Sequence, residues 1–442
     1  MAPLIIRNDM YPLQSLHEHL LTLDPDGSLL LPTNITENVL LLVQFRATGR
    51  EPRIHISTPN GESIQQFFEP NSAGSRYLNL TGFAAHNHTL IVDPQDCHIE
   101  REVTLLQFPQ IKFDEGPLLI VAPHADDAEL AAYGLYRQHA ERCWIVTVSA
   151  GEKLQSLKRQ YVPGLDQDID QAELRKGLLR AWNSATTPLL AGVSASRLIM
   201  LGYFNMTLHQ MMTDLNSVVP HPSGLQATPT NFRRFNQFPL PSDSDVKNRG
   251  EDLISDLMTL ITHIRPATIV VTHPELDPHS DHIATTKAVA IALDRLSYYP
   301  KEVLLYANHY KGIKGFPYGP EHSGTTLPPA QVKNSFLGTW RVHSEYLSLA
   351  VQKEKVMVLD TMHDLRHQLR PDRRFKQWIA QLRRKCRYRY YGAHPYFQTA
   401  IKAHEVFSVI TGEAFVNGMV AHSPLDAYFG AFRPPISGLY DR

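Results

Sequence analysis

A regular alternation of uniformly apolar runs with helical patterns, beginning near residue 117, constrains the fold of this chain more than any other feature. The apolar runs are PLLIVAPH, CWIVTVSAG, SRLIMLGYF, ATIVVTHP and EVLLYANH. Strands that are apolar on both faces are typical of a parallel sheet covered by helices on both sides. The pattern therefore predicts an α/β fold with an open, doubly wound and mostly parallel sheet. In such sheets, ligands bind outside the carboxyl ends of the strands.

The first 112 residues have a different character. They contain short runs rich in β-branched and aromatic residues, separated by turn signals such as Pro59-Asn60-Gly61. This pattern is typical of a small all-β, sandwich-like domain, with one helix expected near residues 13–21. The domains we expect are a β-rich accessory domain at 1–112, a Rossmann-like α/β domain at 113–410 with an aperiodic insert at about 205–248, and a tail at 411–442. An insert of that length is usually a lid, a binding loop or a disordered segment.

The composition excludes several classes of protein. The chain has 43 Lys+Arg and 44 Asp+Glu, and a chain so close to neutral is not expected to bind nucleic acid. There is neither a secretory signal pattern nor an apolar run of the ~18 residues that a membrane-spanning helix needs, so we expect a cytoplasmic protein. The three cysteines, Cys97, Cys143 and Cys386, are too few and too widely spaced for a disulfide framework.

One basic stretch with interleaved aromatic residues, DRRFKQWIAQLRRKCRYRYYG at 372–392, stands out near the C-terminus. We expect a solvated amphipathic helix there. The alternative is peripheral contact with a membrane surface or another anionic partner.

Two acids and a histidine follow the first apolar run, in the motif PHADDAE at 123–129. His124 and Asp127 are three residues apart, close enough to reach one ion from a tight turn, and both residue types bind Zn²⁺. Asp126 lies between them and points elsewhere, so it would be available to act on metal-bound water. Glu129 is expected to be an acid at a helix N-terminus, where the helix dipole favours its charge.

A second motif, His279-Ser280-Asp281-His282, follows the run ATIVVTHP and leads into a helix. His282, in the first turn of that helix, is the candidate third ligand, and His279 lies nearby. Asp281 would hold one of the rings in the required tautomer. Each motif alone would more often be a helix-capping Asp beside a surface His. Because both motifs follow apolar strands, the sequence predicts one shared metal site.

The two motifs resemble those of the zinc-dependent de-N-acetylases related to N-acetylglucosaminyl-phosphatidylinositol deacetylase. This PIG-L/LmbE-like family includes the deacetylases of mycothiol and bacillithiol synthesis. Residues 123–129 match its signature of Ala or Pro, His, Pro or Ala, Asp, Asp, any residue and Glu, and residues 279–282 match its H-x-D-H signature. Looser matches are Thr147–Glu152, Arg175, Lys355, His363 and Glu405–Phe407. The likeness covers about residues 116–410.

The resemblance implies roles for individual residues. His124, Asp127 and His282 would bind zinc, and Asp126 would be the general base. His279, held protonated by Asp281, would stabilise the oxyanion that forms when water attacks an acetamide. Arg175 would contact the sugar. Further candidates for the rim of the site are Glu152, His273, Glu275 and Asp277. The chain departs from the family pattern at Leu178, Asn205 and Ala131-Ala132, where the family often has Glu, Asp and a Gly-Gly pair.

The implied function is a zinc-dependent hydrolase that removes the N-acetyl group from an amino sugar of the GlcNAc or GalNAc type. The substrate would be part of a glycan or glycolipid, such as a lipopolysaccharide core or a surface polysaccharide precursor. The alternative is a non-catalytic glycan-binding or scaffold protein built on a deacetylase fold. A Mg²⁺-dependent transferase would use oxygen ligands alone, and the paired histidines count against it. The ligand types do not fix the metal, because His and Asp also bind iron, cobalt and nickel.

Overall fold

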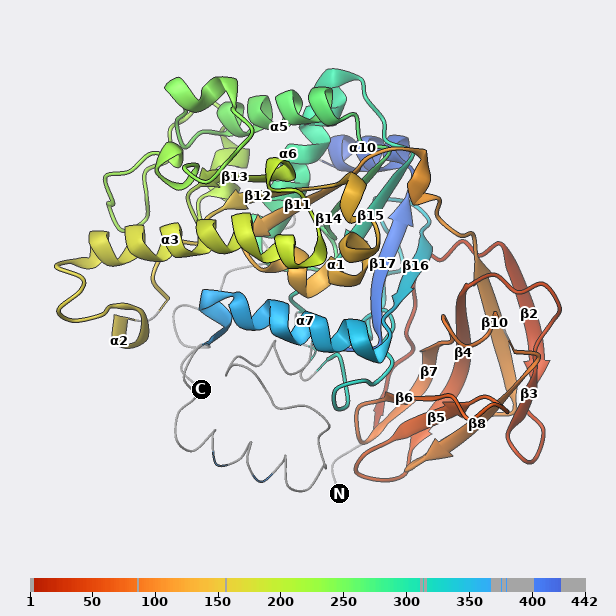
Figure 1. Ribbon diagram of the computed structural model, residues 1–442. Coiled ribbons are helices and arrows are strands. Elements are labelled where there is room, and N and C mark those ends of the chain that lie inside the picture. The colour runs from red at the N-terminus through yellow and green to blue at the C-terminus, as the bar shows by residue number, and fades with distance from the viewer. Residues whose placement is uncertain are drawn as a thin grey trace.

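The computed structural model describes residues 4–366, except 86, 156, 311–312 and 314–315, together with residues 375, 379 and 401–422. Apart from residues 375 and 379, the basic stretch at 372–392 lies outside the described residues, as do residues 423–442 of the expected tail. A β-rich region at the N-terminus lies beside a larger region in which helices surround a sheet (Figure 1).

The β-rich region contains two sheets. Its strands are β1 (Ile5–Ile6), β2 (His17–Thr22), β3 (Ser28–Leu30), β4 (Asn38–Ala47), β5 (Arg53–Ser57), β6 (Ser63–Phe67), β7 (Ser72–Asn79), β8 (Thr89–Gln95), β9 (Cys97–Ile99) and β10 (Glu102–Phe108). One sheet has the order β1-β7-β4-β10-β2, with β9 also paired to β4, and the other has the order β3-β8-β5-β6. Leu41, Ile54 and Leu90 are fully buried members of one apolar cluster that draws on both sheets. The β-rich prediction for this region is therefore confirmed.

The prediction of a helix near residues 13–21 is wrong. Residues 17–22 form β2, which pairs in antiparallel fashion with β10 at the edge of the larger sheet. The sequence HEHLLT alternates between more and less exposed side chains, which is the period of a strand. Pairing with β10 supplies the hydrogen bonds that an isolated short helix would lack.

The second region is built on a seven-stranded sheet of order β13-β12-β11-β14-β15-β17-β16. Its strands are β11 (Leu118–His124), β12 (Cys143–Ser149), β13 (Leu198–Tyr203), β14 (Thr268–Thr272), β15 (Glu302–Tyr306), β16 (Arg341–Tyr346) and β17 (His404–Ile410). Strands β11 to β15 are parallel to one another, whereas β17 is antiparallel to both of its neighbours. The predicted α/β class, with parallel strands, is confirmed.

Helices lie on both faces of this sheet. They are α1 (Asp127–Gln138), α2 (Leu157–Gln160), α3 (Ile169–Thr186), α4 (Leu208–Thr213), α5 (Gly250–Ile264), α6 (Ser280–Leu296), α7 (Leu349–Thr361) and α10 (Gly412–Ala421). Along β11, Leu119 and Val121 join a core with residues of α4, α5, α6 and α10, whereas Leu118 and Ile120 join a core with α1. Burial on both faces explains why the strand is apolar throughout. Among the described residues, no helix is both long enough and apolar enough to cross a membrane.

The insert at about 205–248 is attached to the rest of the α/β region by buried polar contacts. The Asn248 side chain accepts a hydrogen bond from the Phe204 amide at 2.9 Å and donates one to the Val219 carbonyl at 2.8 Å. Arg233 forms a buried ion pair with Asp256 of α5 at 2.6 Å. These contacts hold the aperiodic insert against the end of β13.

Candidate metal centre

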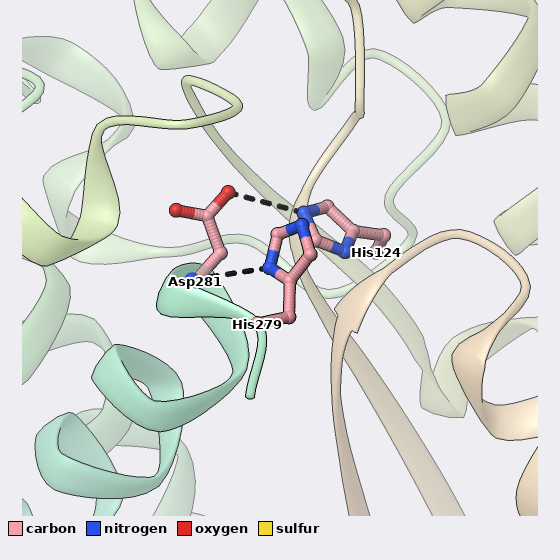
Figure 2. A group of neighbouring side chains, drawn as sticks. All are labelled: His124, His279 and Asp281. Atoms are coloured by element: carbon pink, nitrogen blue, oxygen red, sulfur yellow. Dashed lines mark hydrogen bonds and ion pairs between the residues drawn. The ribbon is translucent and has the colours of Figure 1, made fainter. Parts of the chain in front are cut away.

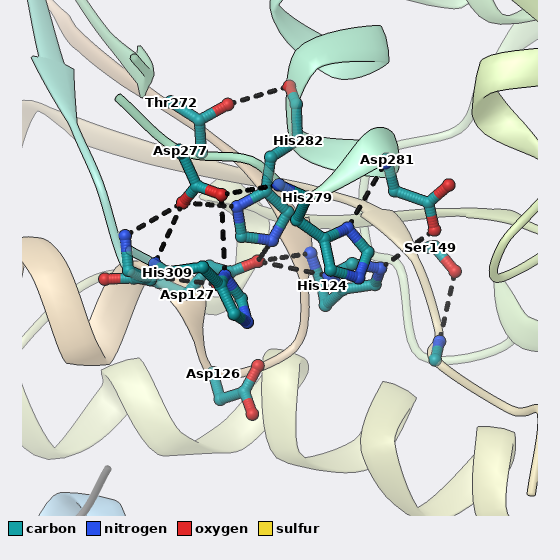
Figure 3. Close-up of polar contacts among 12 residues, drawn as sticks. His124, Asp126, Asp127, Ser149, Thr272, Asp277, His279, Asp281, His282 and His309 are labelled. Carbon is teal, nitrogen blue, oxygen red and sulfur yellow. Dashed lines mark hydrogen bonds and ion pairs between the residues drawn. The ribbon is translucent and has the colours of Figure 1, made fainter. Parts of the chain in front are cut away.

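Two loops at the carboxyl ends of the adjacent strands β11 and β14 bring His124, Asp127 and His282 together (Figure 3). The Asp127 Oδ2 atom lies 3.3 Å from His124 Nδ1 and 3.2 Å from His282 Nε2. Metal–ligand bonds of about 2.0–2.1 Å at tetrahedral angles place ligand atoms about 3.3–3.4 Å apart. The spacing of these atoms therefore suits a single tetrahedral ion. The sequence prediction that these three residues meet agrees with this geometry.

Each of the two imidazole rings uses its other nitrogen to contact a carboxylate. His282 Nδ1 lies 2.9 Å from Asp277 Oδ2, and His124 Nε2 lies 3.2 Å from Asp281 Oδ2 (Figure 2 shows the second pair). A ring that donates to a carboxylate through one nitrogen presents a lone pair on the other, as metal-binding histidines commonly do. The buried His282 Nε2 makes no hydrogen bond of ordinary geometry among the described residues, although Asp127 Oδ2 lies 3.2 Å away. A buried ring nitrogen that faces a carboxylate in this way fits a metal ligand.

The electrostatics of the metal-free cluster show how strongly these groups interact. Burial, the largest influence, lowers the pKa of His124, but hydrogen bonds with Asp127 and Asp281 outweigh it and raise that pKa to about 9. The pKa of His282 is likewise raised well above its ordinary value, because Asp127 and Asp277 outweigh burial. Without a metal, the carboxylates therefore hold protons on the two rings, and a metal ion must displace them.

A third loop, after β15, completes the cluster. The Asn308 Nδ2 atom donates to Asp127 Oδ1 at 2.8 Å, and the amides of Asn308 and His309 donate to Asp277 Oδ2 at 2.9 and 3.2 Å. The His309 ring centre lies 4.7 Å from that of His282. Sequence analysis named Asp277 only as a rim residue and missed Asn308 and His309. The signal available for both was their position at the end of the apolar run EVLLYANH.

Asp126 occupies a strained backbone position between the two ligands of the first loop. Its φ of 134° is unusual for a residue other than glycine, and strain of this kind concentrates at functional sites. The Asp126 carboxylate does not cap α1. Its Oδ1 lies 3.3 Å from Arg180 Nη2, and the side chain is 17% exposed. A carboxylate turned away from the helix and still reachable by solvent is suited to exchange protons with a bound substrate.

His279 differs from the sequence expectation. The Asp281 carboxylate contacts His124, while His279 Nδ1 accepts a hydrogen bond from the Asp281 backbone amide at 3.2 Å (Figure 2). Burial and the neighbouring His282 and His124 rings lower the pKa of His279 to about 3. Asp281 therefore does not hold His279 protonated. The ring is neutral, and its Nε2 carries the hydrogen because Nδ1 is an acceptor.

Arg175 is also placed differently from the expectation. Its guanidinium forms two 2.7 Å bonds with the Asp166 carboxylate and another with the Gln160 carbonyl. Arg180, five residues further along α3, contacts Asp126 and donates to the Ala150 carbonyl at 2.9 Å. The structure thus brings Arg180, which sequence analysis missed, to the cluster in place of Arg175.

The other rim candidates have partners of their own. Glu152 accepts from the Asn205 amide at 2.8 Å and contacts His221 of the insert at 3.0 Å. Glu275 accepts from the Ser335 hydroxyl at 2.6 Å.

Glu129, expected to be a charged acid at the start of α1, is 3% exposed, and burial raises its pKa to about 8, so it is largely uncharged at neutral pH. The expected interaction of a charged Glu129 with the helix dipole is therefore absent near neutral pH.

A buried ion pair shapes the helix that follows the first motif. Helix α1 is interrupted at Ala132, where φ is −138° and ψ is 24°. Lys355 Nζ donates to the Leu130 carbonyl at 2.8 Å before the break and to Glu405 at 2.7 Å. Glu405 in turn accepts from the Gly134 amide at 3.0 Å after the break. The pair satisfies backbone groups that the interruption would leave unpaired.

Among the comparisons with known proteins, a family match covers the two loops that carry His124, Asp127 and His282. Residues 119–293 match the family described as PIG-L: GlcNAc-PI de-N-acetylase, and no curated protein matches the chain. Three solved structures are similar in part. The 4-carboxy-2-hydroxymuconate hydratase GalB from Pseudomonas putida is 12% identical, with 67% of this chain and 95% of that chain covered and a TM-score of 0.34. The N,N′-diacetylchitobiose deacetylase from Pyrococcus horikoshii is 14% identical, with 71% of this chain and 89% of that chain covered and a TM-score of 0.34. A conserved protein from Thermus thermophilus is 18% identical, with 46% of this chain and 69% of that chain covered and a TM-score of 0.25. Residues 119–293 of this chain therefore form a domain of the PIG-L family.

Proposed function

We propose that this protein is a zinc-dependent de-N-acetylase that hydrolyses the acetamide of an amino sugar of the GlcNAc or GalNAc type. The sugar would be carried in a glycan or glycolipid, such as a lipopolysaccharide core or a surface polysaccharide precursor. The observation that carries the proposal is the convergence of His124, Asp127 and His282 at ligand spacing. The family match of residues 119–293 supports the reaction class. Residues 113–410 would form the catalytic domain and 1–112 an accessory domain.

The donor set fits zinc. Two imidazole nitrogens and one carboxylate oxygen, with a fourth position left for water or substrate, are typical of catalytic zinc sites. When bound, the metal supplies Lewis acidity at this point. Asp277 and Asp281 orient the His282 and His124 rings, and Asn308 fixes the Asp127 carboxylate.

The remaining residues of the cluster supply the proton transfers and hydrogen bonds. Asp126 would accept the proton of the attacking water, with Arg180 holding its carboxylate in place. The neutral His279 would donate its Nε2 hydrogen to the acetamide oxygen as that oxygen gains negative charge. Because the His279 ring is neutral and carries no extra proton at neutral pH, Asp126 is the better proton donor to the departing amine once it has taken the proton of the attacking water.

The test is the release of acetate from a panel of N-acetylated sugars and glycolipids, with and without a chelator. We expect acetate release that stops with chelator and returns with added zinc. The Asp126→Ala variant should bind zinc like the unmodified protein and lose most of the hydrolysis, by about 100-fold or more. Sugar binding without acetate release across the panel would instead favour the non-catalytic, glycan-binding alternative.

A further inference from the structure

A cavity of about 310 Å³ lies at the same edge of the sheet as the candidate metal centre. Its walls come from α1, the segment after β14, the end of β15, the described part of the connection between β15 and β16, helix α7 and strand β17. Asn308 belongs to both places, because it lines the cavity and its side chain donates to Asp127 at 2.8 Å. This volume is at the low end of the ~300–1,000 Å³ of small-molecule sites, so it suits a single ring-sized group.

The β-rich region holds one wall of this cavity in place. Residues 325–328 line the cavity and lie between β15 and β16. The Asn79 side-chain Nδ2 donates to the Thr325 carbonyl at 2.9 Å, and the Tyr11 hydroxyl donates to the Pro328 carbonyl. The N-terminal region therefore helps to shape the cavity, although none of its described residues lines it.

The charged groups of the wall are engaged within the protein. Lys355 and Glu405 form an ion pair at 2.7 Å. Lys402 Nζ donates to the three consecutive carbonyls of residues 318–320 at 2.8–3.0 Å. Burial lowers the pKa of His273 to about 3, so this ring is neutral. A cavity whose charges are already compensated favours a neutral ligand over a phosphate or carboxylate, which would have to be desolvated without a new counter-charge.

The wall also contains polar groups that a hydrocarbon could not satisfy. His273 Nε2, the Tyr306 hydroxyl and the Thr326 hydroxyl are buried, and none has a hydrogen-bond partner among the described residues. His273 Nδ1 accepts from the Glu275 amide at 3.2 Å, so Nε2 carries the hydrogen and is a donor. None of these three atoms is exposed to the cavity in this structure. A ligand with hydroxyl and ether oxygens would therefore pair with them only after these side chains turn towards it, whereas an acyl chain could not pair with them at all.

We propose that the cavity binds a neutral sugar ring, the one linked to the N-acetylated sugar whose acetamide reaches the metal centre. The aromatic rings of Tyr310 and Phe316, edge to face at 5.0 Å, belong to the same wall and offer apolar surface for one face of the sugar. The inference rests on the proposed function, because it identifies the second unit of that substrate.

The first experiment compares two substrates, N-acetylglucosamine and its β-linked dimer N,N′-diacetylchitobiose. The zinc-loaded protein should have the higher kcat/KM for the dimer. Thr326→Leu, which adds bulk to the cavity, should lower kcat/KM for the dimer about 10-fold or more and change that for the monosaccharide by less than about 2-fold. Thr326→Val and Tyr306→Phe, which each remove only a hydroxyl, should have smaller effects in the same direction.

Thr285→Val is the matched control. The Thr285 hydroxyl is also buried without a partner among the described residues, but it lies in α6 and does not line the cavity. It should leave the ratio of the two kcat/KM values unchanged. Equal losses for both substrates in the Thr326 variants, or no loss for either, would overturn the inference.

A second experiment measures binding without the reaction, so that this inference and the proposed function can fail separately. Calorimetric titration with methyl β-glucoside should show saturable binding that Thr326→Leu abolishes, while glucose 6-phosphate should bind more weakly. Such binding in a protein that releases no acetate would support the cavity assignment and reject the deacetylase. Acetate release with no binding of the glucoside, or with a preference for the phosphorylated sugar, would reject the cavity assignment and leave the deacetylase standing.

Discussion

The two histidines of the candidate metal centre are held in the same way by acids of very different origin. His124, the last residue of β11, contacts Asp281, which is 157 residues further along the chain. His282, in the first turn of α6, contacts Asp277, which is only five residues away in the loop before this helix. The first pair therefore exists only when segments from two strand ends meet, whereas the second belongs to one continuous segment. The comparison separates what the fold contributes to the site from what one loop contributes.

The largest effect should come from removing a ring itself. His282→Ala should lower the affinity for zinc by on the order of 1,000-fold or more, because loss of a direct ligand exceeds the ~10–100-fold that an orienting partner costs. Competition with a chromophoric chelator measures this. His263→Ala, which changes an exposed histidine of α5, is the control and should bind zinc normally. Unchanged zinc affinity in His282→Ala would remove this ring from the metal centre.

The two orienting acids should differ from each other. Asp277 Oδ2 accepts from the His282 ring and from two backbone amides. An asparagine there replaces one carboxylate oxygen with an NH2 group, which cannot accept from these donors, and it removes the negative charge. We therefore expect Asp277→Asn to lower zinc affinity by nearly 100-fold and Asp281→Asn by nearer 10-fold, within the range for such partners.

Thermal unfolding of the metal-free variants separates orientation of a ring from general loss of structure. If Asp281 mainly ties the two loops together, its variant should also unfold at a lower temperature. Equal zinc affinities for the two asparagine variants would show that the local and the distant pair contribute alike.

The pH dependence of zinc binding gives an intermediate effect. The pKa of His124 is raised to about 9 in the metal-free protein, because hydrogen bonds with Asp127 and Asp281 outweigh burial. Below that pH the His124 ring is therefore doubly protonated and positively charged, and zinc must displace the proton on the nitrogen that it binds. Affinity should rise about tenfold per pH unit between pH 6 and 8 for each proton displaced. Asp281→Asn removes one of the groups that holds the proton, so its zinc affinity should depend less steeply on pH. Chelator competition across this range measures both slopes.

Much of the fold could be predicted from sequence because the parallel strands are apolar on both faces. The pattern identified β11 to β15 and the long helices α1, α3, α5 and α6 between them, but not the short helices α2 and α4. It did not identify β16 and β17 as the antiparallel end of the sheet. In RVHSEY and HEVFSVI, polar residues such as Ser344, His404 and Ser408 are buried by tertiary contacts rather than by an apolar pattern. The error at β2 has a similar cause, since pairing with β10 decided its conformation.

The site was predictable where its residues lie within short motifs. His124, Asp127 and His282 follow two strands whose ends meet at one edge of the sheet, so sequence position alone placed them together. Asn308 comes from a third loop that carries no motif, and its contact with Asp127 depends on the order of strands in the sheet. Such contacts could not be read from the sequence without that order.

The smallest predicted effect concerns the two arginines of α3. Arg175 and Arg180 are five residues apart, so at 3.6 residues per turn they project about 140° apart around the helix. The sequence pattern did not show which of these directions faces the site. Arg180 contacts Asp126, whereas Arg175 is paired with Asp166. Arg180→Met should therefore lower kcat by about 10-fold with little change in KM, because it leaves the general base less well positioned.

Arg175→Met is the matched change and should alter kcat by less than about 2-fold, since Arg175 is paired with Asp166 and it is Arg180 that pairs with Asp126. Arg180→Lys keeps a positive charge and should recover part of the lost kcat. If Arg175→Met lowered kcat more than Arg180→Met did, the family-based assignment of Arg175 would be the better one. The contact between Arg180 and Asp126 would then have no part in catalysis.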